Sequence, residues 1–187
     1  MRRASLTIVA AAVSTFSLAG AAFAAGNACE TEMQAASTKY GVPLGMLYAV
    51  GLTESGHKES LQPFAMNIAG APYFAPSLDD ALRRFDEATA AGVTLIDIGC
   101  MQINHHFHGE NFASVAKMFE PHANVDYAAR FLKTLRDQEG SWTLAVARYH
   151  AGPNNNPAQK QYVCAVIVNM VATGFGTWTA PARDFCN

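Results

Sequence analysis

The sequence contains few charged side chains and no cluster of either sign. Of its 187 residues, 13 are lysine or arginine and 15 are aspartate or glutamate, so the formal net charge is −2. A protein that binds nucleic acid or an anionic membrane surface concentrates basic residues on one face. The composition therefore argues against a nucleic-acid partner and favours an uncharged or mixed-charge ligand.

The chain also lacks internal repeats, low-complexity tracts and linkers rich in proline, glycine or serine. Half of its residues are apolar, which is enough to form a hydrophobic core in a chain of this length. We therefore expect one monomeric domain over residues 25–187, in which residues 175–187 form a C-terminal tail.

A long apolar run lies close to the start of the chain. The basic start Met1–Arg3 precedes an apolar stretch over residues 6–22, and Ala22-Phe23-Ala24 supplies the small residues that a signal peptidase reads. We interpret residues 1–24 as a signal peptide, which predicts export to the periplasm. An uncleaved membrane anchor is the alternative, but the many alanine, serine, threonine and glycine residues make the stretch a weak anchor.

Cysteine is scarce, and its number is even. All four cysteines follow the predicted signal peptide, at Cys29, Cys100, Cys164 and Cys186. In an exported chain they predict two disulfides, for which three pairings exist. Pairing Cys29 with Cys186 and Cys100 with Cys164 is preferred because it joins the two ends of the mature chain, but the other two pairings stay open.

The hydrophobic pattern is mainly helical. Helices are predicted over residues 29–40, 44–56, 77–92, 112–119, 125–138, 142–149 and 157–173, the fifth of them directly after Asn124. Residues 65–68 and 72–74 flank Ala69-Gly70-Ala71 as a hairpin would, and residues 93–98 form another short β-like run. These elements predict an α+β fold that is mostly α-helical, with a small antiparallel β-sheet.

Glu54 is a charged residue in an otherwise apolar segment. The predicted helix that begins at Leu44 is apolar on nearly every side and ends in Thr53-Glu54-Ser55-Gly56. Burial disfavours the ionised carboxylate, and a protonated carboxyl group can give its proton to a leaving oxygen near neutral pH. The ordinary alternative is a glutamate at a helix end that turns outward into solvent.

Other motifs accompany Glu54 in a definite order. Gly41-Val42-Pro43 precedes it, and Gly99–Asn104, Ala147–Gly152 and Tyr162-Val163 follow it. In this order the sequence resembles the small, single-domain members of the lytic transglycosylase SLT domain family, which cleave peptidoglycan and have a goose-lysozyme-like fold. The resemblance covers nearly the whole mature chain, to about residue 173, and implies a lysozyme-like domain.

The resemblance implies a role for each matching residue. Glu54 matches the catalytic acid/base. The residues that match substrate-binding positions are Ser55, Met101, Gln102, Asn104, Tyr149, His150 and Tyr162. Two positions depart from the family pattern. Cys100 replaces a branched apolar residue, consistent with a disulfide, and His150 replaces an asparagine thought to hold the N-acetyl group of the sugar, although histidine can also donate a hydrogen bond.

The resemblance implies cleavage of the β-1,4 bond between N-acetylmuramic acid and N-acetylglucosamine, without a cofactor. If Glu54 acts alone, the product is a 1,6-anhydromuramoyl end. A muramidase that uses Asp97 as a second carboxylate is the alternative, although an aspartate at such a junction commonly caps a turn. A non-catalytic glycan-binding module is a further alternative. Small members of the family accompany envelope-spanning secretion, conjugation or flagellar assemblies, so the expected partners are peptidoglycan strands and an assembly of this kind.

Other candidate sites are less favoured. His105, His106 and His108 are close in sequence, but neighbouring histidines point in different directions, so we expect no metal site. A nucleophilic Cys100 would need a free thiol. Residues 57–97 are expected to form one wall of a cleft, and the aromatic residues best placed to stack on sugars are Tyr73, Phe74 and Phe107.

Overall fold

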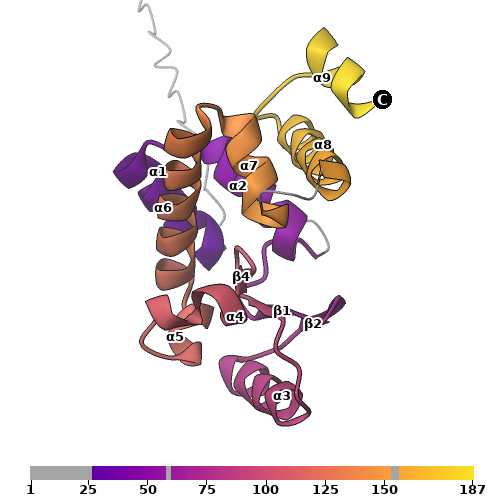
Figure 1. Ribbon diagram of the computed structural model, residues 1–187. Coiled ribbons are helices and arrows are strands. Elements are labelled where there is room, and N and C mark those ends of the chain that lie inside the picture. The colour runs from indigo at the N-terminus through magenta and orange to yellow at the C-terminus, as the bar shows by residue number, and fades with distance from the viewer. Residues whose placement is uncertain (1–26, 58–59, 153–155) are drawn as a thin grey trace, which may run out of the picture.

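The computed structural model describes residues 27–57, 60–152 and 156–187 of the chain (Figure 1). The predicted signal peptide lies outside the described residues. The elements are, in chain order, α1 (Ala28–Tyr40), α2 (Leu44–Ser55), β1 (Ala65–Ile68), β2 (Ala71–Phe74), α3 (Leu78–Ala90), β3 (Ile96–Ile98), β4 (Ile103–Asn104), α4 (His105–His108), η1 (Gly109–Asn111), α5 (Val115–Phe119), α6 (Pro121–Glu139), α7 (Trp142–Ala151), α8 (Asn156–Ala172) and α9 (Ala180–Cys186). The fold is α+β and mostly helical, with a small antiparallel sheet, as predicted.

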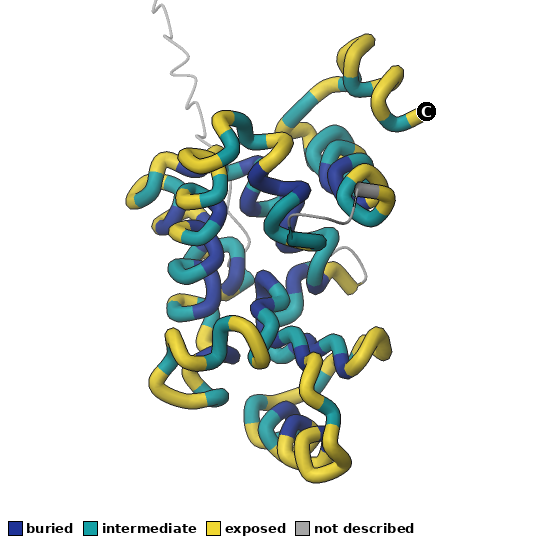
Figure 2. Tube along the Cα trace, in the orientation of Figure 1, coloured by how far each residue is buried: buried dark blue, intermediate teal, exposed yellow. Residues whose placement is uncertain are grey.

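Five helices form the larger part of the molecule. α1 packs along α6, α6 packs against α7, α7 against α8, and α8 against α2. The centre of this group is α2, which buries Leu47, Ala49 and Val50 completely. Figure 2 shows the buried segments gathered where these helices face one another. The prediction of a helix that is apolar on nearly all sides, and therefore buried, is confirmed.

The helix ends follow the local signals in the sequence. The Ser77 hydroxyl accepts a hydrogen bond from the backbone N–H of Asp80 at 3.2 Å and caps α3. The Ser141 hydroxyl accepts a hydrogen bond from the backbone N–H of Leu144 at 3.2 Å and caps α7. Gly41 ends α1 with a φ of 67°, a left-handed conformation that glycine adopts without a steric cost. Each of these ends was predicted from a single residue and its neighbours.

The sheet lies below the helical group in Figure 1, with α3 beneath it. Its strand order is β2-β1-β3-β4, and every neighbouring pair is antiparallel. The predicted hairpin pairs Ala65 with Phe74, and the predicted third run supplies β3, in which Ile98 pairs with Met66. β4 was not predicted because a strand of two residues has no detectable alternation.

The start of α6 differs from the prediction. The helix begins at Pro121, because proline is well tolerated in a first turn, and Asn124 lies inside the helix instead of before it. The Asn124 side chain is completely buried. Its Oδ1 accepts a hydrogen bond from the backbone N–H of Met101 at 2.8 Å. Its amide donates to the carbonyl oxygens of Ile98 at 2.9 Å and Met118 at 2.8 Å.

Replacing Asn124 tests the importance of this internal amide. The Asn124→Ala variant removes three hydrogen bonds to buried backbone groups, so we expect it to lower the free energy of unfolding by about 3 kcal/mol. Urea unfolding measures this difference. Asn111→Ala is the matched control, because the exposed Asn111 amide makes one hydrogen bond at the surface, and its effect should stay within about 0.5 kcal/mol. Equal effects of the two substitutions would contradict the prediction.

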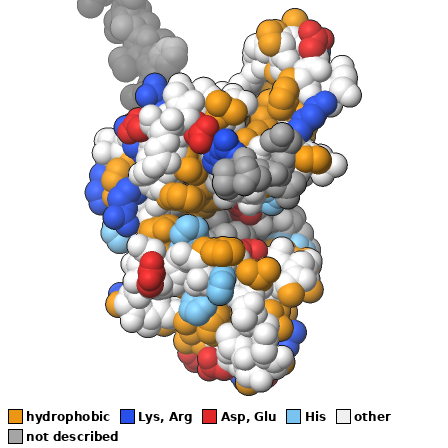
Figure 3. Space-filling model, in the orientation of Figure 1, with side chains coloured by type: hydrophobic (Ala, Val, Ile, Leu, Met, Phe, Trp, Pro, Cys, Tyr) orange, Lys and Arg blue, Asp and Glu red, His pale blue; other side chains and the backbone are white. Residues whose placement is uncertain are grey.

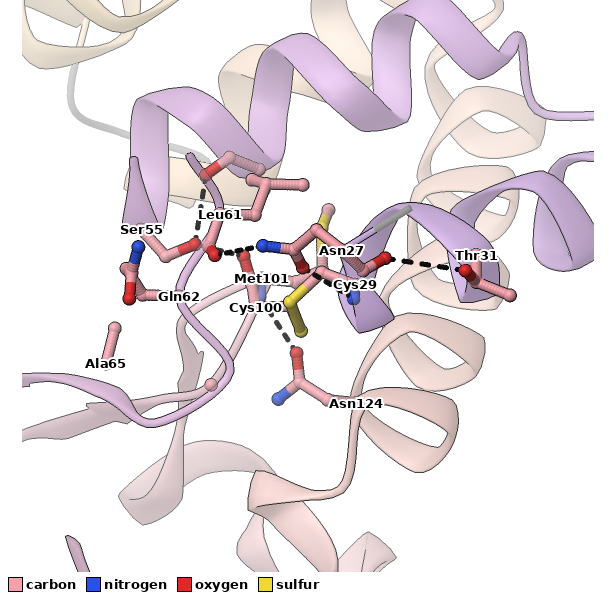
Figure 4. Close-up of a disulfide and its surroundings, with 12 residues drawn as sticks. Asn27, Cys29, Thr31, Ser55, Leu61, Gln62, Ala65, Cys100, Met101 and Asn124 are labelled. Atoms are coloured by element: carbon pink, nitrogen blue, oxygen red, sulfur yellow. Dashed lines mark hydrogen bonds between the residues drawn. A yellow bond between two sulfur atoms is a disulfide. The ribbon is translucent and has the colours of Figure 1, made fainter. Parts of the chain in front are cut away.

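Two disulfides form, as predicted, but their preferred pairing was wrong. Cys29 is bonded to Cys100 and Cys164 to Cys186. The first turn of α1 lies against the loop after β3, which brings the Cα atoms of Cys29 and Cys100 to 5.8 Å (Figure 4). The chain end returns to α8 instead of α1 (Figure 1), so α9 is joined to α8. All four cysteines are bonded, which excludes the alternative of a free Cys100 nucleophile.

Candidate active site

Glu54 is located where the helical group meets the sheet. It occupies the last turn of α2, and the chain then passes through Ser55 to the segment that leads into β1. Figure 3 shows the molecule hollowed between its helical part and the sheet with α3, and acidic and histidine side chains gather in and around this recess. The segment over residues 57–97, which was expected to form a cleft wall, includes β1, β2 and α3 and ends within β3, all on the sheet side.

The Glu54 side chain points inward and is only 14% exposed. The hydroxyl of Tyr162, on α8, donates a hydrogen bond to Glu54 Oε1 at 2.6 Å. A distance of 2.6 Å is at the short end of the range for O–H···O hydrogen bonds, so Tyr162 holds the carboxyl group closely. The outward, solvated arrangement weighed above is therefore not the one that the chain adopts.

His150 approaches the same carboxyl oxygen from the C-terminal end of α7. Its Nδ1 lies 3.9 Å from Glu54 Oε1, and 43% of its side chain is exposed. Its ring is stacked on that of Tyr162, with the centroids 4.2 Å apart and the planes 3° from parallel. The interaction with Glu54 raises the pKa of His150 above its usual value, burial acts in the opposite direction, and the charge of Asp97 adds to the increase.

Asp97 is a second carboxyl group close enough to interact electrostatically with Glu54. Burial raises the pKa of Asp97, and the negative charge of Glu54 raises it further. The amide of Asn104, opposite Asp97 in the β3–β4 pair, donates to Asp97 Oδ1 at 2.7 Å and acts in the opposite direction. Asn104 is therefore engaged with Asp97 in this structure.

Two tyrosine hydroxyl groups near Glu54 are held in their protonated, hydrogen-bond-donating form. Burial raises the pKa of Tyr162 well above its usual value, and the nearby Glu54 charge raises it further. Burial and the Glu54 charge have the same effect on the pKa of Tyr149. The Tyr149 hydroxyl donates to the backbone carbonyl of Met101 at 2.8 Å. Tyr162 thus holds the carboxyl group, and Tyr149 holds the loop beside it.

The loop over residues 99–102 is fixed to α2 and to the sheet. The Ser55 hydroxyl donates to the carbonyl oxygen of Cys100 at 2.7 Å (Figure 4). Gln102 has a φ of 46°, which is uncommon for a residue with a side chain. Its amide donates to the carbonyls of Gly99 at 2.9 Å and Ala65 at 3.1 Å, which stabilises this conformation.

Gly99 begins this loop with a φ of 82°. A Cβ atom at this position would lie 2.6 Å from the amide nitrogen of Asn124. Both the backbone conformation and the close packing therefore require glycine here. The loop thus depends on a helix residue, Asn124, that the sequence motif does not include.

The structure brings some of the predicted site residues together and places others behind them. Glu54, His150 and Tyr162 are in contact, and Asp97 interacts with the first two. The Ser55 and Met101 side chains are buried, at 1% and 0% exposure. The role of these two residues in binding a sugar stays a prediction, as do the roles of Gln102, Asn104 and Tyr149.

The clustered histidines take part in aromatic packing. His105 packs edge-on against Phe85, and the Nδ1 of His108 lies 2.8 Å from the Tyr127 hydroxyl. No group of three or more histidine, cysteine, aspartate or glutamate side chains in the described part of the chain is arranged to hold a metal ion. Phe107 is 63% exposed, and its predicted stacking on a sugar, like that of Tyr73 and Phe74, stays a prediction.

The enclosed carboxyl group of Glu54 is a candidate acid/base in a mostly helical α+β fold. The protein-family model for the transglycosylase SLT domain matches residues 31–166. The match covers well over half of the chain, so the protein belongs to the transglycosylase SLT domain family, whose members act on peptidoglycan and are generally lytic transglycosylases. The comparisons with curated proteins and with solved structures found no match.

Proposed function

We propose that this protein is a lytic transglycosylase that cleaves the β-1,4 bond between N-acetylmuramic acid and N-acetylglucosamine. The observation that carries the proposal is the placement of Glu54. Its carboxyl group is mostly enclosed, at 14% exposure, and it accepts a 2.6 Å hydrogen bond from Tyr162. A single positioned carboxyl group can act first as an acid and then as a base.

In the first step, Glu54 acts as the acid. It gives its proton to the glycosidic oxygen, and the bond between this oxygen and C1 of N-acetylmuramic acid breaks. The 2-acetamido oxygen of the same sugar forms a bond to C1 and stabilises it as an oxazolinium-like species. The N-acetylglucosamine end leaves with a new hydroxyl group, and Glu54 is left as a carboxylate.

In the second step, Glu54 acts as the base. The carboxylate takes the proton of the C6 hydroxyl group, and the C6 oxygen attacks C1 while the acetamido oxygen leaves. The product is a 1,6-anhydromuramoyl end, Glu54 has regained its proton, and water is not consumed. Tyr162 supports both steps because its hydroxyl keeps the carboxyl group in one orientation.

Asp97 supports a second candidate function, a muramidase. Asp97 is close enough to Glu54 for the Glu54 charge to raise the pKa of Asp97, and two carboxyl groups are what a hydrolase ordinarily uses. However, burial raises the pKa of Asp97, which disfavours the ionised form that a second carboxylate needs. We therefore favour the mechanism that uses Glu54 alone.

Digestion of purified peptidoglycan sacculi distinguishes the two functions. We expect mass spectrometry to find 1,6-anhydromuramoyl ends, which are lighter than reducing ends by one water. The Asp97→Asn variant should still give anhydro ends, because the proposed mechanism does not use this carboxylate. Reducing ends from the unmodified protein, and their loss in Asp97→Asn, would instead establish the muramidase.

We also propose that the protein acts in the periplasm, as a monomer. The two disulfides are consistent with export, because disulfides persist in oxidising compartments. No helix in the described parts of the chain is both long and apolar enough to cross a membrane. An accompanying envelope-spanning secretion, conjugation or flagellar assembly stays a prediction.

A further inference from the structure

We propose that His150 is a positioning residue that controls the charge of Glu54 through a pH-dependent ion pair. The inference rests on the function proposed above and concerns the same site. This pH dependence requires a histidine at position 150, because an imidazole can carry a positive charge.

The geometry of three side chains carries the proposal. Tyr162 donates its hydroxyl hydrogen to Glu54 Oε1 at 2.6 Å, and the Nδ1 of His150 lies 3.9 Å from the same oxygen. The His150 and Tyr162 rings are stacked in parallel at 4.2 Å, which fixes the plane of the imidazole. The histidine therefore stays beside the carboxyl group, and its charge acts directly on Glu54.

The charges around the imidazole favour its protonated form. Glu54 reaches it from α2 and Asp97 from β3, and both carboxylates attract an imidazolium ion. Tyr162, which faces it from α8, stays neutral. α6, the other helix packed on α7, contributes Glu139, which is paired with Arg148 at 3.0 Å. Burial of the His150 imidazole acts in the opposite direction, because it lowers the pKa of this group.

The sign of the pH effect follows from this arrangement. Because the pKa of His150 is raised, the imidazolium is present below that raised pKa and is lost as the pH increases through it. The imidazolium stabilises the carboxylate form of Glu54, but the first step needs the protonated form. At lower pH the ion pair thus restrains proton donation, and at higher pH the neutral imidazole no longer does so.

The first test measures the ion pair without using activity. The His150 imidazole is titrated by NMR in the unmodified protein and in the Glu54→Gln variant, which has no charge at position 54. We expect the titration midpoint of His150 to move to lower pH in the variant. An unchanged midpoint would overturn the inference, whether or not the protein is a lytic transglycosylase.

The second test measures how kcat/KM depends on pH for cleavage of solubilised peptidoglycan strands. Because kcat/KM reports the steps up to bond cleavage, it reports the acid step. His150→Asn should raise kcat/KM about fivefold over the unmodified protein at about pH 5, and the two profiles should converge at about pH 9. A uniform loss at every pH would indicate that His150 only binds substrate, and would overturn the inference.

The matched control is His122→Asn. His122 also pairs with a glutamate, since its Nδ1 lies 2.8 Å from Glu32 on α1, but the pair lies at the surface between α1 and α6. We expect the pH profile of this variant to be the same as that of the unmodified protein. If the profile of His122→Asn were shifted, the loss of a histidine charge far from Glu54 would be enough to change the pH dependence of kcat/KM. The assignment to His150 would then fail.

Discussion

The Glu54→Gln variant should fold normally and lose nearly all turnover. Glutamine keeps the shape of the side chain, and its amide oxygen can still accept the hydrogen bond from Tyr162. The amide has no proton to give to the glycosidic oxygen, so we expect kcat to fall by about 100- to 10,000-fold. Release of soluble fragments from sacculi measures turnover, and thermal unfolding verifies that the fold is retained.

A control of the same chemical type is available at Glu87. This residue lies on α3, is 56% exposed and pairs with Arg84 at the surface, so Glu87→Gln should keep its full activity. If Glu54→Gln retained near-normal turnover while remaining folded, the carboxyl group of Glu54 would not be the acid. The proposed function would then lose its basis, since no other carboxyl group has been assigned this role.

Removal of the Cys29–Cys100 disulfide should destabilise the protein more than any other change considered. The bond joins residues 71 positions apart, and closing a loop of this length in the unfolded chain corresponds to about 4 kcal/mol. Both cysteines are completely buried, so alanine is a suitable replacement. We expect the double variant Cys29→Ala/Cys100→Ala to lose about this much free energy of unfolding in urea titrations under non-reducing conditions.

The other disulfide is the matched comparison. Cys164 and Cys186 are 22 positions apart, and their bond ties the short α9 to α8 at the edge of the molecule (Figure 1). The loop length alone predicts a smaller loss, about 3 kcal/mol. If removing Cys164 and Cys186 destabilised the protein more than removing Cys29 and Cys100, loop length and burial would not account for the stability that the disulfides supply.

Local features of the structure were predictable wherever a few neighbouring residues decide them. The Ser77 and Ser141 caps and the Ala69-Gly70 turn depend on the chain within four residues of each position. The buried α2 was also predictable, because a segment that is apolar on every side must be enclosed. Glu54 was a candidate for the same reason, since a carboxyl group in such a segment requires an explanation.

Features that depend on distant segments were not predictable. The number of cysteines predicts two bonds, but the choice of partner depends on where α1, α8 and the chain end lie in the folded protein. The Asp97–Asn104 hydrogen bond depends on β4, whose two residues carry no periodic signal. The stacking of His150 on Tyr162 requires α7 and α8 to lie side by side, and no local sequence pattern predicts this arrangement.

Because Gly99 packs directly against Asn124, the residue that is tolerated at one of these positions depends on the residue at the other. A residue with a side chain at position 99 would adopt an unfavourable backbone and would also displace the Asn124 amide, which lies 2.6 Å from the place of a Cβ atom. A smaller residue at position 124 would leave room for a side chain at position 99, but the hydrogen bond to the carbonyl oxygen of Ile98 would be lost. In related chains the two positions should therefore vary together, and their substitution energies should not add.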